Sequence, residues 1–174
     1  MGGGAAVTLR PALAALLLAA AAAAPAQPAT APAASGAAAS APASLIGPAR
    51  CRFAVPAAWD TRQVRWTGDC RDGLAQGLGT LRALQGNKVL RIFYGRLKDG
   101  QPVLGVVESD GGFQAGRFEN GLAVQDGERN TLIRAFETAS AAATEVAQRY
   151  QAGGNPASAR YYRQKATQLA QQMD

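Results

Sequence analysis

Two cysteines, Cys51 and Cys70, are the side chains of this sequence best suited to covalent chemistry. The sequence contains no histidine, which excludes Ser-His and Cys-His nucleophile pairs and removes the commonest metal ligand and general base. The two cysteines lie too far apart for a redox pair, and they supply only half of the ligands of a structural zinc site. In an exported chain an even number of cysteines favours a structural bridge. We therefore predict a Cys51–Cys70 disulfide, no metal site and no cofactor.

Carboxylates are the remaining candidates for acid and base chemistry. Two carboxylates are sufficient for glycoside hydrolysis, and Glu108, Asp110 and Glu119 are the candidates in this sequence. They lie near predicted turns of a sheet that we expect to be too small for a deep cleft. We therefore expect a non-enzymatic protein, with a carboxylate-based hydrolase of the cell envelope as the alternative.

The first 26 residues resemble a secretory signal peptide. Arg10 is the only charge before an apolar run from Ala12 to Ala24, and Ala24-Pro25-Ala26 supplies a pattern of small residues for cleavage. A transmembrane anchor is the alternative, but the run is shorter than the roughly 20 residues that cross a bilayer. We expect cleavage after Ala26 and an exported protein, either periplasmic or secreted.

Residues 27–49 are rich in proline and alanine and carry no charge and no aromatic ring. Proline interrupts helices, and a segment with so little apolar bulk cannot offset the entropy lost on ordering. We predict a disordered linker, which either holds the domain away from a wall or membrane or is a tolerated tail.

A pattern of strands and tight turns repeats between Val64 and Gly127. Its three copies share a dipeptide that accepts positive φ at both residues, as in a two-residue hairpin turn: Asp72-Gly73, Asp99-Gly100 and Asn120-Gly121. Apolar residues and glycine alternate with polar residues from Val64 to Arg71, as in a strand with one buried face. We expect the ring of Trp66 to lie flat over the glycine-containing backbone beside it.

The first copy resembles a MORN repeat. It runs Trp66-x-Gly68-x-Cys70-x-x-Gly73-x-Ala75-x-Gly77-x-Gly79, which is similar to the family's pattern of aromatic-x-Gly-x-aromatic, then Asn/Asp-Gly, then Gly-x-Gly. The cysteine in the second aromatic position, with a partner cysteine upstream, resembles small exported bacterial MORN-like proteins. The second copy has Leu104 and Val106 in place of the closing glycines, and the third has Gln114 in place of the ring.

This resemblance implies an antiparallel array of β-hairpin repeats over residues 50–127. It also implies a scaffold or a module that lies against membranes and contacts lipid. The residues expected to shape the repeats are Trp66, Gly68, Gly73, Gly77, Gly79, Phe93, Gly95, Gly100, Gly116, Phe118 and Gly121.

The apolar period changes beyond Gly127, and residues 128–174 are expected to form a helical hairpin. One helix is predicted from about Arg129 to Ala152, and Asn155 and Pro156 are a typical start for a second. The apolar stripes of the two helices are Leu132, Phe136, Ala139, Ala143, Val146 and Tyr150, then Ala159, Tyr162, Ala166, Leu169 and Met173. We expect an α+β fold in which this hairpin covers the open end of the array; self-association with a second copy through these helices is the alternative.

Positive charge is concentrated in the first half of the predicted domain. The formal net charge of the whole sequence is +6, and the balance is about +7 over residues 50–98 and about −5 over residues 99–128. Arg65, Lys88 and Arg91, together with Arg82 and Arg96, are candidates for a face that binds anionic lipid or an envelope polyanion. The alternative is a solvated face whose cations prevent aggregation. An unidentified envelope protein is a further possible partner, and we do not expect nucleic acid.

Overall fold

A computed structural model describes residues 44–57, 59, 61, 63–124 and 126–173. The chain divides into two units, residues 1–37 and 38–174, and every described residue belongs to the second. The predicted signal peptide, and the predicted linker up to residue 43, lie outside the described residues. Within the described ranges, no helix is both long enough and apolar enough to cross a membrane.

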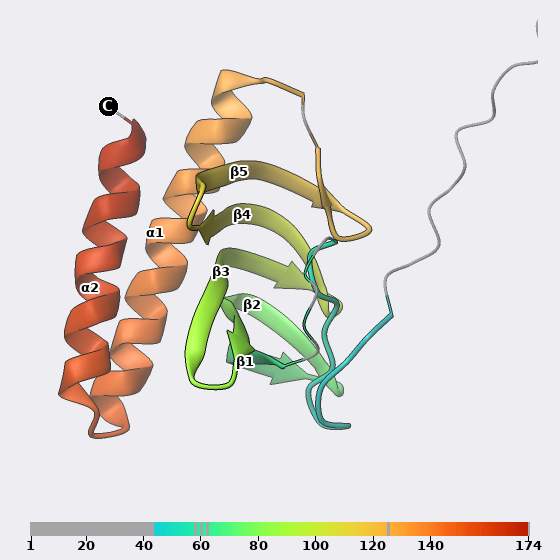
Figure 1. The fold of residues 1–174 in the computed structure, drawn as a ribbon, viewed down its shortest axis with the longest axis vertical. Helices are drawn as coiled ribbons and strands as arrows, with labels where there is room; N and C mark the ends of the chain where they lie inside the picture. Colours follow the sequence, from blue (N-terminus) through green and yellow to red (C-terminus); the bar gives the residue numbers. More distant parts are fainter. Residues whose placement is uncertain (1–43, 58, 60, 62, 125, 174) are drawn as a thin grey trace, which may run out of the picture. The chain divides into compact units, whose positions relative to one another are not determined.

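Six strands form one antiparallel sheet in which each strand pairs with its neighbours in the sequence (Figure 1). The strands are β1 (Val64–Arg71), β2 (Leu74–Gln85), β3 (Lys88–Lys98), β4 (Gln101–Ser109), β5 (Gly112–Glu119) and β6 (Leu122–Ala123). Asp72, Asp99 and Asn120 have φ near 50°, and each is followed by a glycine with φ between 76° and 80°. The three predicted hairpin turns are therefore confirmed, and they all lie at the same end of the sheet.

One face of the sheet carries the aromatic residues of the repeats, and we call it the aromatic face. A Cβ on Gly68 would lie 2.6 Å from Trp66 Cε2, and one on Gly95 would lie 2.5 Å from Phe93 Cζ. Each ring therefore lies over the glycine two residues later, as the sequence predicted for Trp66. Phe93 also meets Phe118 edge to face, with ring centroids 5.2 Å apart.

A segment before the first strand crosses the three hairpin turns in order. The N–H groups of Arg52, Ala54 and Ala57 donate to the carbonyl oxygens of Gly73, Gly100 and Gly121 at 2.8, 2.7 and 2.6 Å. Figure 1 shows this segment running past the ends of the strands. Phe53 is buried against the aromatic face, so the segment supplies part of the core there.

The predicted boundary between linker and domain at residue 50 is wrong. Ile46 and Phe53 exchange two backbone hydrogen bonds of 2.8 Å, and Ile46 packs against the core of the aromatic face. The folded domain therefore includes Ile46. The sequence did not indicate this, because Ile46 is one apolar residue in a stretch rich in proline and alanine.

α1 spans Arg129–Ala152 as predicted, and α2 spans Pro156–Ala170 and continues into the short 3-10 helix η1 (Gln171–Met173). α1 covers the opposite face of the sheet, which we call the helix face, and α2 packs on α1 and reaches the sheet through side chains such as Tyr162 and Lys165 (Figure 1). The Asn155 side chain caps α2 by accepting from the Ser158 N–H at 3.0 Å. The expectation that the hairpin covers the open end of the array is wrong, because α1 contacts strands β1 to β5 across the face of the sheet.

The helices pack closely because their contacting residues are small. α1 buries five alanines, and the Ser140 hydroxyl donates to the Ala166 carbonyl oxygen of α2 at 2.9 Å. The predicted stripes are buried in their middle but not at their ends, since Leu132 is 38% exposed and Met173 is only half-buried.

Candidate functional site

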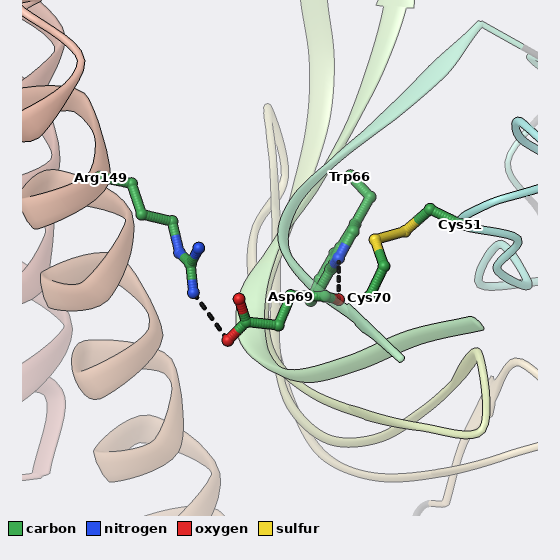
Figure 2. Close-up of a disulfide and its surroundings, with 5 residues drawn as sticks. All are labelled: Cys51, Trp66, Asp69, Cys70 and Arg149. Atoms are coloured by element: carbon green, nitrogen blue, oxygen red, sulfur yellow. Dashed lines mark hydrogen bonds and ion pairs between the residues drawn. A yellow bond between two sulfur atoms is a disulfide. The ribbon is translucent and has the colours of Figure 1, made fainter. Parts of the chain in front are cut away.

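The predicted disulfide is present and attaches the N-terminal segment to β1. Cys51 and Cys70 are bonded, with their Cα atoms 5.4 Å apart. Figure 2 shows the bridge beside Trp66, whose indole N–H donates to the Asp69 carbonyl oxygen at 3.0 Å. On the other side of β1, the Asp69 carboxylate pairs with Arg149 of α1 at 2.8 Å. This part of β1 is therefore connected both to the N-terminal segment and to the helical hairpin.

Removing the bridge should destabilise the fold without unfolding it. For Cys51→Ser/Cys70→Ser we expect the free energy of unfolding to fall by about 3 kcal/mol, because the open chain gains entropy when it unfolds. The melting temperature measured by circular dichroism should fall by several degrees. An Arg149→Met variant is the comparison, because its exposed ion pair contributes less than about 1 kcal/mol. Equal melting temperatures for the bridged and serine proteins would contradict this expectation.

The structure brings most of the predicted repeat residues together. Gly79 lies opposite Gly68 in the register, and the Trp66 ring covers both. Gly95 lies opposite Gly105, which in turn lies opposite Gly116. Gly105 was not among the predicted residues, although a glycine in the middle of a strand, next to large apolar residues, indicates close packing against the backbone. Gly77 has φ of 78° at an irregularity in the pairing of β1 with β2.

The predicted basic residues do not share one surface. Arg65 lies directly opposite Arg82, which places both side chains on the helix face. Arg91 lies opposite Ala83 and two residues from Phe93, which places it on the aromatic face. Lys88 is exposed at the beginning of β3, next to the β2–β3 turn. The register therefore puts Arg65 and Arg91 on opposite faces of the sheet, although Arg91 lies beside an irregularity in the pairing of β2 with β3 and its side chain also lines the cleft described below.

A cleft of about 310 Å³ lies between the helix face and α2, and its lining makes it the best candidate for a functional site. Ile92 of β3 lies between Arg82 of β2 and Glu108 of β4 in the register. The first two turns of α2 contribute Ser158, Tyr161 and Tyr162. The other lining residues are Val89, Leu90, Arg91, Ser109 and Asp110.

Glu108 is at the centre of a polar network in this cleft. Lys165 of α2 donates to its Oε1 at 2.6 Å, and the Tyr94 hydroxyl donates to its Oε2 at 3.1 Å. Lys165 also donates to the Gln168 side-chain oxygen at 2.7 Å. The Glu108 and Lys165 side chains are 24% and 11% exposed, so this ion pair is largely shielded from water. Shielding strengthens the attraction between the charges and makes the loss of either partner costly.

All four tyrosines of the sequence meet beside this network. Tyr162 stacks on Tyr150 with centroids 5.5 Å apart, and it meets Tyr161 edge to face at 5.0 Å and Tyr94 at 6.4 Å. Burial raises the pKa of Tyr162 to about 12, against the opposing effect of the Arg82 guanidinium. Burial also raises the pKa of Tyr94. Both hydroxyls therefore stay protonated and able to donate at neutral pH.

The three candidate carboxylates are not arranged as a set. Glu108 and Asp110 both line the cleft. Glu108 lies opposite Phe113, whereas Glu119 is six residues further along β5, roughly 20 Å away at about 3.4 Å per residue. That distance exceeds the roughly 5 to 9.5 Å between the two carboxylates of a glycosidase. Glu119 therefore cannot act together with Glu108.

The residues that the sequence analysis did not single out are Tyr94, Tyr161 and Lys165. Tyr161 and Lys165 are one helical turn apart on α2, and Lys165 lies 5.9 Å from the centre of the Tyr161 ring. That spacing was visible in the sequence, but nothing in it indicated that Glu108 would meet them. Within the described ranges, no three cysteine, aspartate or glutamate side chains gather as a metal site would require.

Comparison with protein-family models, with curated proteins and with solved structures finds no match for this chain.

Proposed function

We propose that this chain is an exported, non-enzymatic binding or scaffolding protein of the cell envelope, with a MORN-like β-hairpin array as its platform. The observation that carries the proposal is the position of Glu108. It is one of the two carboxylates that line the cleft, and both of its oxygens are already hydrogen-bonded, to Lys165 and to Tyr94. A carboxylate engaged in this way holds α2 against the sheet, which is a structural role.

The disulfide supports the exported part of the proposal. Disulfides form and persist in oxidising compartments and are rare in the cytosol. In such a compartment the Cys51–Cys70 bridge would persist and would keep the N-terminal segment attached to the first hairpin.

Contact with an anionic surface is the binding activity that the charge distribution favours. Arg65 and Lys88 are exposed, and the register places Arg65 and Arg91 on opposite faces. A flat membrane can therefore contact only one of Arg65 and Arg91 at a time. A cation near an anionic membrane contributes about 1 kcal/mol, so we expect weak binding that is lost as salt rises.

Co-sedimentation of the purified chain with vesicles tests this proposal. We expect binding to vesicles that contain phosphatidylglycerol, no binding to phosphatidylcholine vesicles, and weaker binding when the ionic strength is raised. Lys88→Ala, next to the β2–β3 turn, and Arg65→Ala, on β1, are measured separately, and the variant that lacks the contacting cation should bind about fivefold more weakly.

Two results would contradict the proposal. Equal binding to charged and neutral vesicles would remove the anionic surface as a partner and leave the scaffolding of another protein. Release of soluble sugars from purified cell wall, if Glu108→Gln abolished it, would establish the hydrolase alternative, because Glu108 and Asp110 both line the cleft.

A further inference from the structure

Two arginines lie side by side on the helix face without an acidic partner. Arg65 and Arg82 are directly opposite each other in the register of β1 and β2. Like charges in this position repel each other and destabilise a sheet. Among the described residues, the acidic side chains that form ion pairs are Asp69, Glu108, Asp126 and Glu145, and their cations are Arg117, Arg149 and Lys165. Neither Arg65 nor Arg82 is among these cations.

Arg82 is also the member of this pair that lines the cleft. It is half-buried, and its Nε atom is buried without a hydrogen-bond partner in the described part of the chain. A buried Nε–H without an acceptor loses hydration that nothing replaces. An oxyanion entering the cleft would supply acceptors for the fork-shaped guanidinium and would reduce the repulsion from Arg65.

The rest of the lining suggests what the oxyanion is attached to. Ser158 and Tyr161 offer hydroxyl groups on the α2 side, and Tyr161 is 45% exposed, so part of its ring is open to solvent. Val89 and Ile92 add apolar surface, and Val89 is 40% exposed. A cleft of about 310 Å³ is near the lower limit for small-molecule sites, so the ligand must be compact.

We propose that this cleft binds a small ligand whose carboxylate or phosphate group is held by Arg82 and whose ring-shaped body packs against Tyr161. The proposal is independent of the proposed contact with an anionic surface, since it concerns a small molecule in solution.

The charged groups that determine where the oxyanion lies are Arg82 and Arg91, Glu108 and Asp110 in the lining, and Lys165 beside it. Glu108 lies two strands away from Arg82, roughly 10 Å at the usual spacing of strands, and Lys165 compensates its charge at 2.6 Å. Asp110 lies in the turn after β4 and repels an anion at that end. The oxyanion is therefore expected at the β2 end of the cleft, with the body of the ligand extending over Ile92 toward Tyr161.

Calorimetric titration of the purified chain at constant ionic strength tests the proposal. The probes are benzoate and phenyl phosphate, which carry the two kinds of oxyanion on a ring, and benzyl alcohol, which carries the ring without a charge. We expect saturable binding of one molecule of benzoate or phenyl phosphate per chain. The probe that binds more tightly identifies the oxyanion, and benzyl alcohol should bind at least tenfold more weakly than that probe.

Matched variants separate the cleft from the general positive charge. Arg82→Met should weaken binding roughly tenfold or more, because it removes charge-assisted hydrogen bonds. Arg134→Met makes the same change in charge on an exposed residue of α1 and should leave binding unchanged. Arg82→Lys keeps the charge without the fork-shaped donor and should give an intermediate affinity even if Arg82→Met folds poorly.

Three results would overturn the proposal. They are the absence of saturable binding for both charged probes, equal affinity for benzyl alcohol, and equal weakening by Arg82→Met and Arg134→Met. The last result would indicate attraction to the overall charge of the chain.

Discussion

Replacing Gly95 by alanine is expected to lower the free energy of unfolding by about 3 kcal/mol, which is a large effect for one added methyl group. A Cβ at this position would lie 2.4 Å from the Leu104 carbonyl oxygen, 2.5 Å from Phe93 Cζ and 2.9 Å from the Gly105 Cα. Two of these three atoms belong to the backbone of β4, and Phe93 is fully buried, so none of them can move without disturbing the sheet.

Urea unfolding of Gly95→Ala beside Gly111→Ala measures this effect. The nearest atom to a Cβ on Gly111 is the Ser109 hydroxyl oxygen at 3.7 Å, which is an ordinary contact, so this variant should change stability by less than about 1 kcal/mol. Similar stabilities for the two variants would mean that Phe93 does not lie over the backbone at Gly95, and the ring-on-glycine packing of the second repeat would have to be abandoned.

Replacing Lys165 by methionine is expected to lower the free energy of unfolding by about 2 to 4 kcal/mol. The variant leaves the Glu108 carboxylate between the sheet and α2 with only the Tyr94 hydroxyl as partner. Glu108→Gln in the same chain removes the unpaired charge, so the double variant should recover part of the loss. Denaturant unfolding of the two single variants and the double variant gives the coupling energy between the two residues.

The exposed pair between Arg149 and Asp69 is the matched control for this cycle. These side chains are 38% and 68% exposed, and water screens their attraction, so Arg149→Met should cost less than about 1 kcal/mol. If Lys165→Met were as mild as Arg149→Met, Glu108 would have to be hydrated in solution, and its role in holding α2 against the sheet would be wrong.

The features that were predicted correctly from the sequence are stabilised by interactions between residues close together in the sequence, or by the one pairing that the residue types allow. The Asp-Gly and Asn-Gly turns follow from residues that accept positive φ, and the start of α2 follows from the Asn155 cap. The disulfide followed from the number of cysteines and the expected compartment. In each case the deciding interaction lies within a few residues or is nearly the only one available.

Placement of one element on another was harder to predict. Alternation along β1 indicated one buried face, but both faces of the middle strands are covered, so it could not show where the helices lie. Leu132 belongs to the apolar stripe of α1 and is nevertheless 38% exposed, so the stripe alone did not determine which of its residues are buried.

The cleft shows the same difficulty. Arg82, Glu108 and Tyr161 come from two strands and a helix that are far apart in the sequence, and none of them stands in a motif. Glu108 was a candidate as a catalytic carboxylate, but its partner Lys165 was not considered. A side chain's chemistry can be read from its type, whereas its protonation and its partners depend on contacts that only the folded chain makes.

The N-terminal segment limits how modular this array can be. In most repeat proteins each unit contacts only its neighbours, so units can be added or removed with little effect on the others. Here three residues of one continuous segment, Arg52, Ala54 and Ala57, each hold the turn of a different hairpin. If a whole repeat were inserted or deleted, the number of turns would no longer match the number of N–H groups that this segment donates to them. Any change in repeat number therefore requires a matching change in the length of the segment, which makes three repeats a fixed property of this chain.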